Sequence, residues 1–192
     1  MNAALEDRPT LPERYATATA SGDLTPRLAG LTDADILLAA GIAASKDSRR
    51  MLALKVYRMG VSGSLDGLLD VTVGADAMLR EHMRKTHQKP MPAMARQQLI
   101  VDTLNWWLKP TCGYCNGTRF VEAMVDGTDE GAGRLTTKAC GGCHGTGKRP
   151  LAREVPQQLK GLAEWLAGEL DRLVALIHAE MAKLLGQRLD LP

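Results

Sequence analysis

The four cysteines of this chain constrain its fold more than any other feature. They form two Cys-x-x-Cys pairs, Cys112 with Cys115 and Cys140 with Cys143, and 24 residues separate the pairs. Two such pairs place four soft thiolates on two tight turns, where they can converge as a tetrahedron around one Zn²⁺. The sequence therefore predicts one zinc ion bound by these four cysteines.

A glycine follows each pair at the same place. Gly117 lies two residues after Cys115, and Gly145 lies two residues after Cys143. A chain that curls around a metal needs positive φ or a free amide near a sulfur at such positions. Four thiolates close the coordination sphere, whereas a catalytic zinc keeps one position open for water. We therefore expect a structural ion worth about 10 kcal/mol of apparent binding free energy, with His144 on the surface.

Four other chemistries are open to the same cysteines. Disulfides need an oxidising compartment, and residues 1–27 show no basic start with an apolar core, so no export signal is expected. The run from Cys140 to His144 matches the haem attachment pattern Cys-x-x-Cys-His, which would leave the other pair without a role. A redox dithiol at Cys112 and Cys115 should follow a strand, but a predicted helix and a proline precede it. An iron–sulfur cluster uses the same four ligands.

Composition predicts a mainly α fold. Aromatic residues make up only 4% of the 192 residues, and Ala, Leu and Met are plentiful. We expect a helical body with an inserted zinc-binding β-hairpin and a long C-terminal helix. The predicted segments are a flexible N-terminal arm (1–30), a helical body (31–109), a zinc-binding module (110–150) and a long C-terminal helix that packs on the body or a partner (151–192).

Helical periodicity and capping residues divide the helical body further. Helices are expected over residues 36–44, 49–59, 65–83 and 92–108. Thr32 is the expected N-cap of the first, Gly60 should close the second, and Gly74 should break or kink the third. The first two helices suggest either a DNA-reading helix-turn-helix or a plain antiparallel pair. With Gly41 at the turn, the position that should pack inward falls on Asp47, which favours the plain pair.

The C-terminal half has a different pattern. Strands are expected over residues 118–125 and 134–138, around a flexible turn. Trp106 and Trp107 precede them and are expected to anchor the zinc module on the helical body, or to stack on bases. One long helix is predicted over residues 156–190. Its apolar stripe, with an 11-residue repeat, consists of Leu159, Leu162, Leu166, Leu170, Leu173, Ile177, Met181 and Leu184.

Charge and motifs limit the function classes. The net charge is +2, and a centre of four thiolates (−4) with Zn²⁺ (+2) would bring it to about zero. Nucleic-acid binding must therefore rest on local patches. The candidate phosphate contacts are Arg49, Arg50, Arg84, Lys85, Lys148 and Arg149. A solvated helix face is the alternative reading of the basic residues around Arg49. The chain shows no Ser/His/Asp arrangement, phosphate loop or membrane span, so a soluble cytoplasmic protein that is not an enzyme is expected.

Two repeats around the cysteines resemble the cysteine-rich domain of DnaJ. They read Cys112-Gly-Tyr-Cys-Asn-Gly-Thr-Arg119 and Cys140-Gly-Gly-Cys-His-Gly-Thr-Gly147, against the family pattern Cys-x-x-Cys-x-Gly-x-Gly. The first ends in Arg119, where glycine is expected. Members of that family carry four repeats and a His-Pro-Asp triplet in their J domain. This chain has two repeats and no such triplet, so co-chaperone function is not implied.

A wider likeness spans about residues 30–150. It rests on Leu31-Thr-Asp-Ala-Asp-Ile36, Ala39-Ala-Gly41, Ser45-Lys46, Ala53-Leu-Lys-Val56, Met59-Gly60-Val61, Gly67-Leu-Leu69 and a helix that leads to the cysteine knuckles. In this layout the chain resembles the late-gene antitermination protein Q family of lambdoid phages. Some members carry more cysteine repeats, and the tail from Pro156 is outside the likeness.

The resemblance implies a transcription antitermination factor in the cytoplasm of a bacterial host. Such a factor binds DNA near a late promoter, engages a paused RNA polymerase that contains σ factor, and makes it read through terminators. No small-molecule substrate is implied. The alternative from the residues alone is a chaperone-like or scaffolding protein that holds a polypeptide with its knuckles and long helix.

Overall fold

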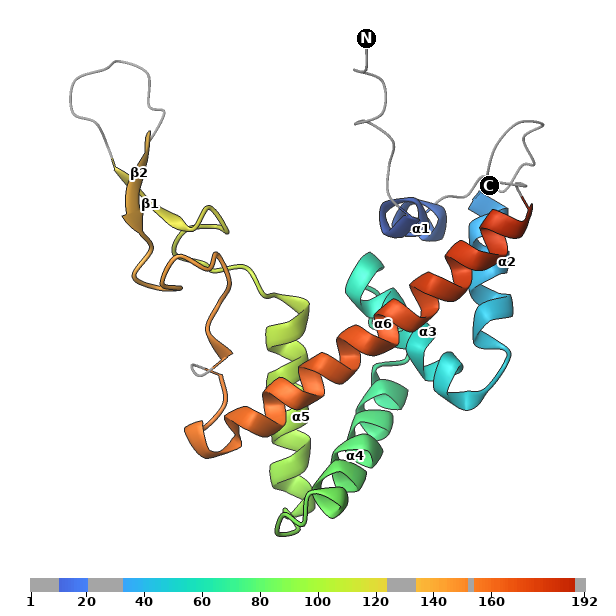
Figure 1. The fold of residues 1–192 in the computed structure, drawn as a ribbon, viewed down its shortest axis with the longest axis horizontal. Coiled ribbons are helices and arrows are strands. Elements are labelled where there is room, and N and C mark those ends of the chain that lie inside the picture. The colour runs from blue at the N-terminus through green and yellow to red at the C-terminus, as the bar shows by residue number, and fades with distance from the viewer. Residues whose placement is uncertain (1–10, 21–32, 124–133, 152–153, 189–192) are drawn as a thin grey trace. The chain divides into compact units, whose positions relative to one another are not determined.

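The structure is a computed structural model, and it describes residues 11–20, 33–123, 134–151 and 154–188 (Figure 1). The described residues are mainly helical, with a small antiparallel hairpin and a long C-terminal helix, as the sequence predicts. The elements are α1 (Leu11–Ala20), α2 (Asp33–Ala44), α3 (Ser48–Ser62), α4 (Leu68–Lys85), α5 (Ala93–Leu108), β1 (Phe120–Ala123), β2 (Arg134–Ala139), the 3₁₀ helix η2 (Gln157–Leu159) and α6 (Lys160–Arg188).

The chain divides into two compact units. Unit 1 comprises residues 1–90 and 168–192, and unit 2 comprises residues 91–167. Unit 2 therefore joins α5, which was expected to belong to the helical body, to the segment that carries the cysteines. None of the described helices is both long and apolar enough to cross a membrane.

In unit 1, α1, α2 and α3 pack on one another and α4 packs on α3. The ring of Tyr15 in α1 meets Tyr57 of α3 edge-on, with 5.0 Å between ring centroids, and both side chains are buried. The prediction of a flexible arm was wrong for residues 11–20. A single tyrosine whose partner lies 42 positions away produces no periodic signal in the sequence. The rest of the arm lies outside the described residues, and so does Thr32, the predicted N-cap.

The ends of α3 are set by local chemistry. The carboxylate of Asp47 accepts a hydrogen bond from the backbone N–H of Arg50 (2.8 Å) and so caps the helix N-terminus. Gly63 ends the helix in the left-handed region (φ 66°), three residues beyond the predicted stop at Gly60. Gly41, which was placed at a turn, lies inside α2. Asp47 is thus an exposed cap and not a core position.

Helix α4 runs through Gly74 without interruption, so the expected break there was wrong. A Cβ atom at Gly74 would lie 2.5 Å from Cδ2 and 2.9 Å from Cδ1 of Leu52. The glycine therefore lets α3 and α4 approach closely, which outweighs its low helix propensity.

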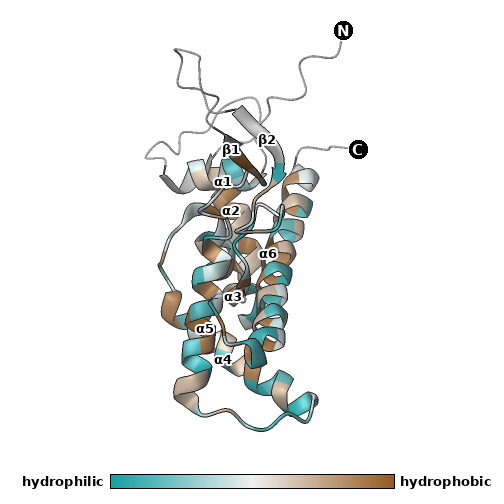
Figure 2. Cartoon of the chain, turned by 90° about the vertical axis from the view of Figure 1, so that its left-hand side faces the viewer, coloured by the Kyte–Doolittle hydropathy of each residue, from teal (hydrophilic) through white to brown (hydrophobic). Residues whose placement is uncertain are grey.

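The apolar stripe of α6 follows the predicted positions over most of its length. In unit 1, Leu170, Leu173, Ile177 and Met181 are at most 1% exposed. Figure 2 shows hydrophobic and hydrophilic residues alternating along this helix. The final member is Leu185 (4% exposed), and the predicted Leu184 beside it is half-buried. The α-helix begins at Lys160 after η2, which leaves Leu159 half-buried.

Two glycine-to-alanine substitutions test the close approach of α3 and α4. Gly74→Ala should lower the free energy of unfolding by about 1–3 kcal/mol, because the new methyl group overlaps Leu52. Gly41→Ala in α2 should raise it by up to about 1 kcal/mol, because nothing lies within 4 Å of its Cβ position. Denaturant unfolding measures both values. Equal stabilisation by the two substitutions would contradict the close packing.

Candidate metal centre

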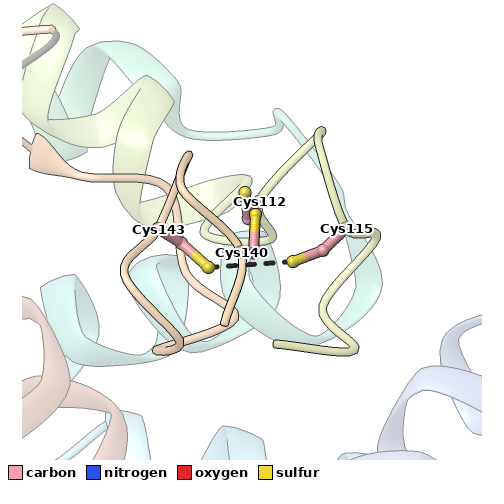
Figure 3. A group of neighbouring side chains, drawn as sticks. All are labelled: Cys112, Cys115, Cys140 and Cys143. Carbon is pink, nitrogen blue, oxygen red and sulfur yellow. Dashed lines mark hydrogen bonds between the residues drawn. The ribbon is translucent and has the colours of Figure 1, made fainter. Parts of the chain in front are cut away.

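The four cysteines converge as the sequence predicts. Their Sγ atoms all lie within 4.8 Å of one another, and every one of these side chains is at most 5% exposed. The Sγ atoms of Cys115 and Cys143 are 3.7 Å apart, and Figure 3 shows the sulfur atoms approaching one another from two loops. Tetrahedral coordination with metal–sulfur distances of about 2.3 Å separates sulfurs by about 3.8 Å. The four free thiols therefore fit one metal ion, and the spacing excludes disulfides, whose sulfurs lie about 2.05 Å apart.

The two loops, which we call the first and second knuckle (residues 112–119 and 140–147), have the same backbone design. Thr118 donates from its backbone N–H (2.8 Å) and its Oγ1 (2.7 Å) to the carbonyl oxygen of Cys115. Thr146 makes the equivalent bonds to Cys143, at 3.1 and 2.8 Å. Each threonine therefore closes the turn that presents the second cysteine of its pair.

Three positions in each knuckle have positive φ. They are Asn116 (45°), Gly117 (85°) and Arg119 (73°) in the first, and His144 (51°), Gly145 (77°) and Gly147 (74°) in the second. This confirms the expectation for Gly117 and Gly145. Arg119 occupies a conformation that costs an L-residue about 1–2 kcal/mol. Its partner position holds Gly147, where a Cβ would lie 2.8 Å from the carbonyl oxygen of Gly117.

The knuckles are linked to each other at both ends. The backbone N–H of Cys112 donates to the carbonyl oxygen of Gly147, and that of Cys140 donates to the carbonyl oxygen of Arg119, both at 2.9 Å. Beyond these bonds, Thr111 pairs with Lys148, and β1 pairs antiparallel with β2, Phe120 opposite Ala139. Each knuckle thus begins beside the end of the other, in an approximate twofold arrangement.

The thiols sit in unequal electrostatic surroundings. Burial raises the pKa of Cys143, but the backbone N–H of Gly147, 3.2 Å from its Sγ, and the neighbouring cysteines together lower it to about 6. Burial raises the pKa of Cys140. A metal binds the thiolate form, so Cys143 is more ready than Cys140 to coordinate near neutral pH. His144 is exposed, as expected, and is not a member of the cluster.

Trp106 anchors the end of the second knuckle to α5. Its indole N–H donates to the carbonyl oxygen of Arg149 (2.6 Å), and the Arg149 guanidinium donates to the carbonyl oxygen of Asn105 (3.1 Å). Arg149 also forms an ion pair with Glu154 at 3.4 Å. Trp106 therefore ties the second knuckle to α5, the last helix of the predicted body, whereas anchoring of the module on the other helices stays a prediction. These bonds make Arg149 a structural residue of unit 2, in addition to its predicted contact with phosphate.

The predicted phosphate contacts of unit 1 differ in their surroundings. Arg49 is exposed and forms no ion pair within the described part of the chain. Arg50 forms ion pairs with Asp47 and Glu180. Arg84 and Lys85 share Glu81, and hydrogen bonds from Arg84 and then from Lys85 lower its pKa to about 2. Only Arg49 among these four thus has no carboxylate partner.

In unit 2, Lys148 is exposed and belongs to the ladder that closes the knuckles. Lys148 and Arg149 are consecutive residues after the second knuckle, and Arg49 and Arg50 are consecutive residues at the start of α3. Sequence reasoning missed Arg172, which lines a cavity of about 560 Å³ in unit 1 with Asp47, Arg49, Arg50, Ala175 and Leu176. It lies 122 positions after Arg50, so no local pattern could have linked the two.

Comparison with known proteins adds no family to these observations. The sequence matches no protein-family model and no curated protein, and no solved structure matches the fold.

Metal removal tests the centre. The purified protein should contain one metal ion per chain, and Cys112→Ser should release it and unfold the knuckles, because buried thiolates cannot remain close together without a cation. His144→Ala is the matched control and should keep the ion, since this exposed side chain is no ligand. Elemental analysis and circular dichroism measure these outcomes. A Cys112→Ser protein with full metal content would contradict the assignment.

Proposed function

We propose that this protein is a zinc-containing transcription antitermination factor of the phage Q type. It binds DNA near a late promoter and acts on a paused, σ-containing RNA polymerase, so that the enzyme reads through terminators. The observation that carries the proposal is one combination in a single chain. The block from Leu31 to Leu69 that resembles the Q family precedes a four-cysteine centre with the spacing and burial of a structural metal site.

Zinc is the metal that we assign to the centre. Four thiolates in tetrahedral spacing suit Zn²⁺, which has no redox chemistry and no geometric preference of its own. Since all four positions are filled by cysteine, the ion has no open position for water. It holds the two knuckles together and takes no part in a reaction. This role suits a protein of the bacterial cytoplasm, where thiols stay reduced.

Binding of promoter-proximal DNA is assigned to the exposed cations. Arg49 stands at the exposed start of α3, and Lys148 stands at the base of the knuckles. Arg50, Arg84, Lys85 and Arg149 are further candidates, but each must exchange a carboxylate partner for a phosphate. The ion pairs of Arg84 and Lys85 with Glu81 are exposed, and exposed pairs are worth less than about 1 kcal/mol, so for these two the exchange costs little. Arg50 and Arg149 are half-buried, and the exchange costs more there.

A polypeptide-binding scaffold is the second candidate, and one observation favours it. Leu65, Leu69 and Val73 follow one another at four-residue spacing, and their exposed fractions are 63%, 75% and 61%. Such a run of exposed apolar side chains is typical of a surface that contacts protein. Either an RNA polymerase subunit or an unfolded client protein could bind this surface.

Transcription in vitro distinguishes the two candidates. On a template with a late promoter, a pause site and a downstream terminator, the protein should increase read-through severalfold. Arg49→Glu should weaken this effect and make it less sensitive to salt, because each phosphate contact contributes about 0.9 to the log–log salt slope and the variant loses one such contact. Arg80→Glu on α4 is the control for an exposed arginine elsewhere in unit 1. No added read-through, combined with suppression of aggregation of an unfolded client, would favour the scaffold.

A further inference from the structure

We propose that the knuckles of unit 2 carry a binding site for single-stranded nucleic acid. In this site Tyr114 stacks on an unpaired base, and Lys109, Arg119 and Lys148 contact the neighbouring phosphates. The inference is independent of antitermination, because such a site would bind single strands whether or not the protein acts on a polymerase.

The first observation is the sign of the charge around the cysteines. Residues 103–121 and 131–153 contain no Asp or Glu, and they contain seven basic residues: Lys109, Arg119, Arg134, Lys138, Lys148, Arg149 and Arg153. Residues 122–130, between these segments, contain Glu122, Asp126, Asp129 and Glu130, and a divalent ion with four thiolates contributes −2, so residues 103–153 keep a charge of about +1 (7 − 4 − 2). The cations nearest the cysteines in the sequence are not interrupted by acids, and such a local group attracts a polyanion at short range even when the whole chain is nearly neutral.

The basic residues around α3 provide a contrast. Lys46, Arg50, Lys55 and Arg58 each lie within 4 Å of a carboxylate, which belongs to Glu180, Asp47, Asp70 or Asp66. The cavity that Arg49 and Arg172 line also contains Asp47. Charge is therefore balanced locally in that part of unit 1. At the knuckles, by contrast, Lys109, Arg119 and Lys148 form no ion pair within the described residues.

The second observation is that the cations of the proposed site share one small structure. Lys148 pairs with Thr111, two residues after Lys109, in the ladder at the base of the knuckles. Cγ of Arg119 lies 3.1 Å from the Cβ position of Gly147, the residue before Lys148. All three side chains are exposed, and within the described residues none of them forms an ion pair. They are therefore available to phosphates without exchanging a partner.

The third observation is the position of Tyr114. Its side chain is 76% exposed, yet it lies directly over Gly142 of the second knuckle, where a Cβ atom would be 2.5 Å from its Cδ2. Contact with Gly142 holds the ring in place while most of its surface stays in water. An aromatic ring that is held in place and exposed, on a module that also carries exposed cations, is the kind of surface on which single-stranded nucleic acids stack their bases.

The geometry favours a single strand over a duplex. A base can stack on Tyr114 only if it has left its own helix, and double helices keep their bases stacked internally. Thymidine and uridine are both suitable partners, because every base offers a flat face. The chemistry shared by DNA and RNA is thus a flexible phosphodiester with unpaired bases.

Binding of the full-length, metal-loaded protein to labelled oligothymidylate and oligouridylate of about 12 nucleotides tests the inference. Fluorescence anisotropy should show binding to both probes, or to one of them, that is tighter than to a duplex of the same length. Tyr114→Ala should weaken it about tenfold, whereas Tyr114→Phe should keep it, because the ring remains. Lys109→Gln and Lys148→Gln should each lower the log–log salt slope by about 0.7.

Arg80→Gln on α4 removes one positive charge from an exposed arginine of unit 1 and should leave the affinity unchanged. The inference is overturned if no single strand binds, if the duplex binds as tightly, or if Arg80→Gln weakens binding as much as Lys148→Gln does. If Tyr114→Ala loses its metal, the two lysine variants decide the matter alone. Loss of read-through with intact single-strand binding would reject the proposed function and leave this site standing.

Arg119→Gly separates binding from folding. Glycine adopts the φ of 73° without strain, so the variant should be at least as stable as the parent. Its folding equilibrium constant should rise by at most about fivefold. It should nonetheless bind the oligonucleotide more weakly, with a salt slope lower by about 0.7. Thermal unfolding and anisotropy measure the two effects. Reduced stability with unchanged binding would assign Arg119 a purely structural role.

Discussion

Four sulfur atoms buried within 4.8 Å of one another are the constraint on which unit 2 depends. Thiolates this close repel one another, and burial adds a desolvation cost, so four of them can be charged together only around a cation. The rest of the module offers little that could substitute for the ion. Its sheet is a two-stranded hairpin, and such hairpins are marginal on their own in water. The knuckles should therefore be folded when the metal is bound and unfold when it is removed.

A metal ion held by the four cysteines would fix the knuckles to each other, and Trp106 fixes them to a helix. The indole N–H of Trp106 is half-buried, and its hydrogen bond to the carbonyl oxygen of Arg149 satisfies it. This bond lies next to the backbone pairing of Thr111 with Lys148. The guanidinium of Arg149 donates to the carbonyl oxygen of Asn105 and forms an ion pair with Glu154. In the sequence Arg149 looks like a free phosphate contact, but in the structure it also holds α5 against the module. The side chain of its neighbour Lys148 forms no ion pair within the described residues.

How far the sequence predicts this structure depends on the range of the interaction. The metal ligands, the hairpin and the stripe from Leu162 to Met181 follow from spacings of a few residues, which are visible in the chain. The helix around Tyr15 and the uninterrupted course of α4 depend on Tyr57 and Leu52, residues distant in sequence, and no local pattern reports them. The same limit applies to charge. The sequence shows that Arg50 is basic, but only the fold shows that Glu180 stands beside it.

The two knuckles show what a metal centre fixes and what it leaves free. Coordination and the cross-knuckle hydrogen bonds fix the backbone, so the three equivalent positions with positive φ share their φ angles to within about 8°. Side chains that point away from the ion are under no such constraint, and there the knuckles differ: Tyr114 corresponds to Gly142, Arg119 to Gly147, and Phe120 to Lys148. Arg119 is the most informative of these differences. Glycine would fit its backbone better, so its side chain must contribute something that the fold of the knuckle does not require.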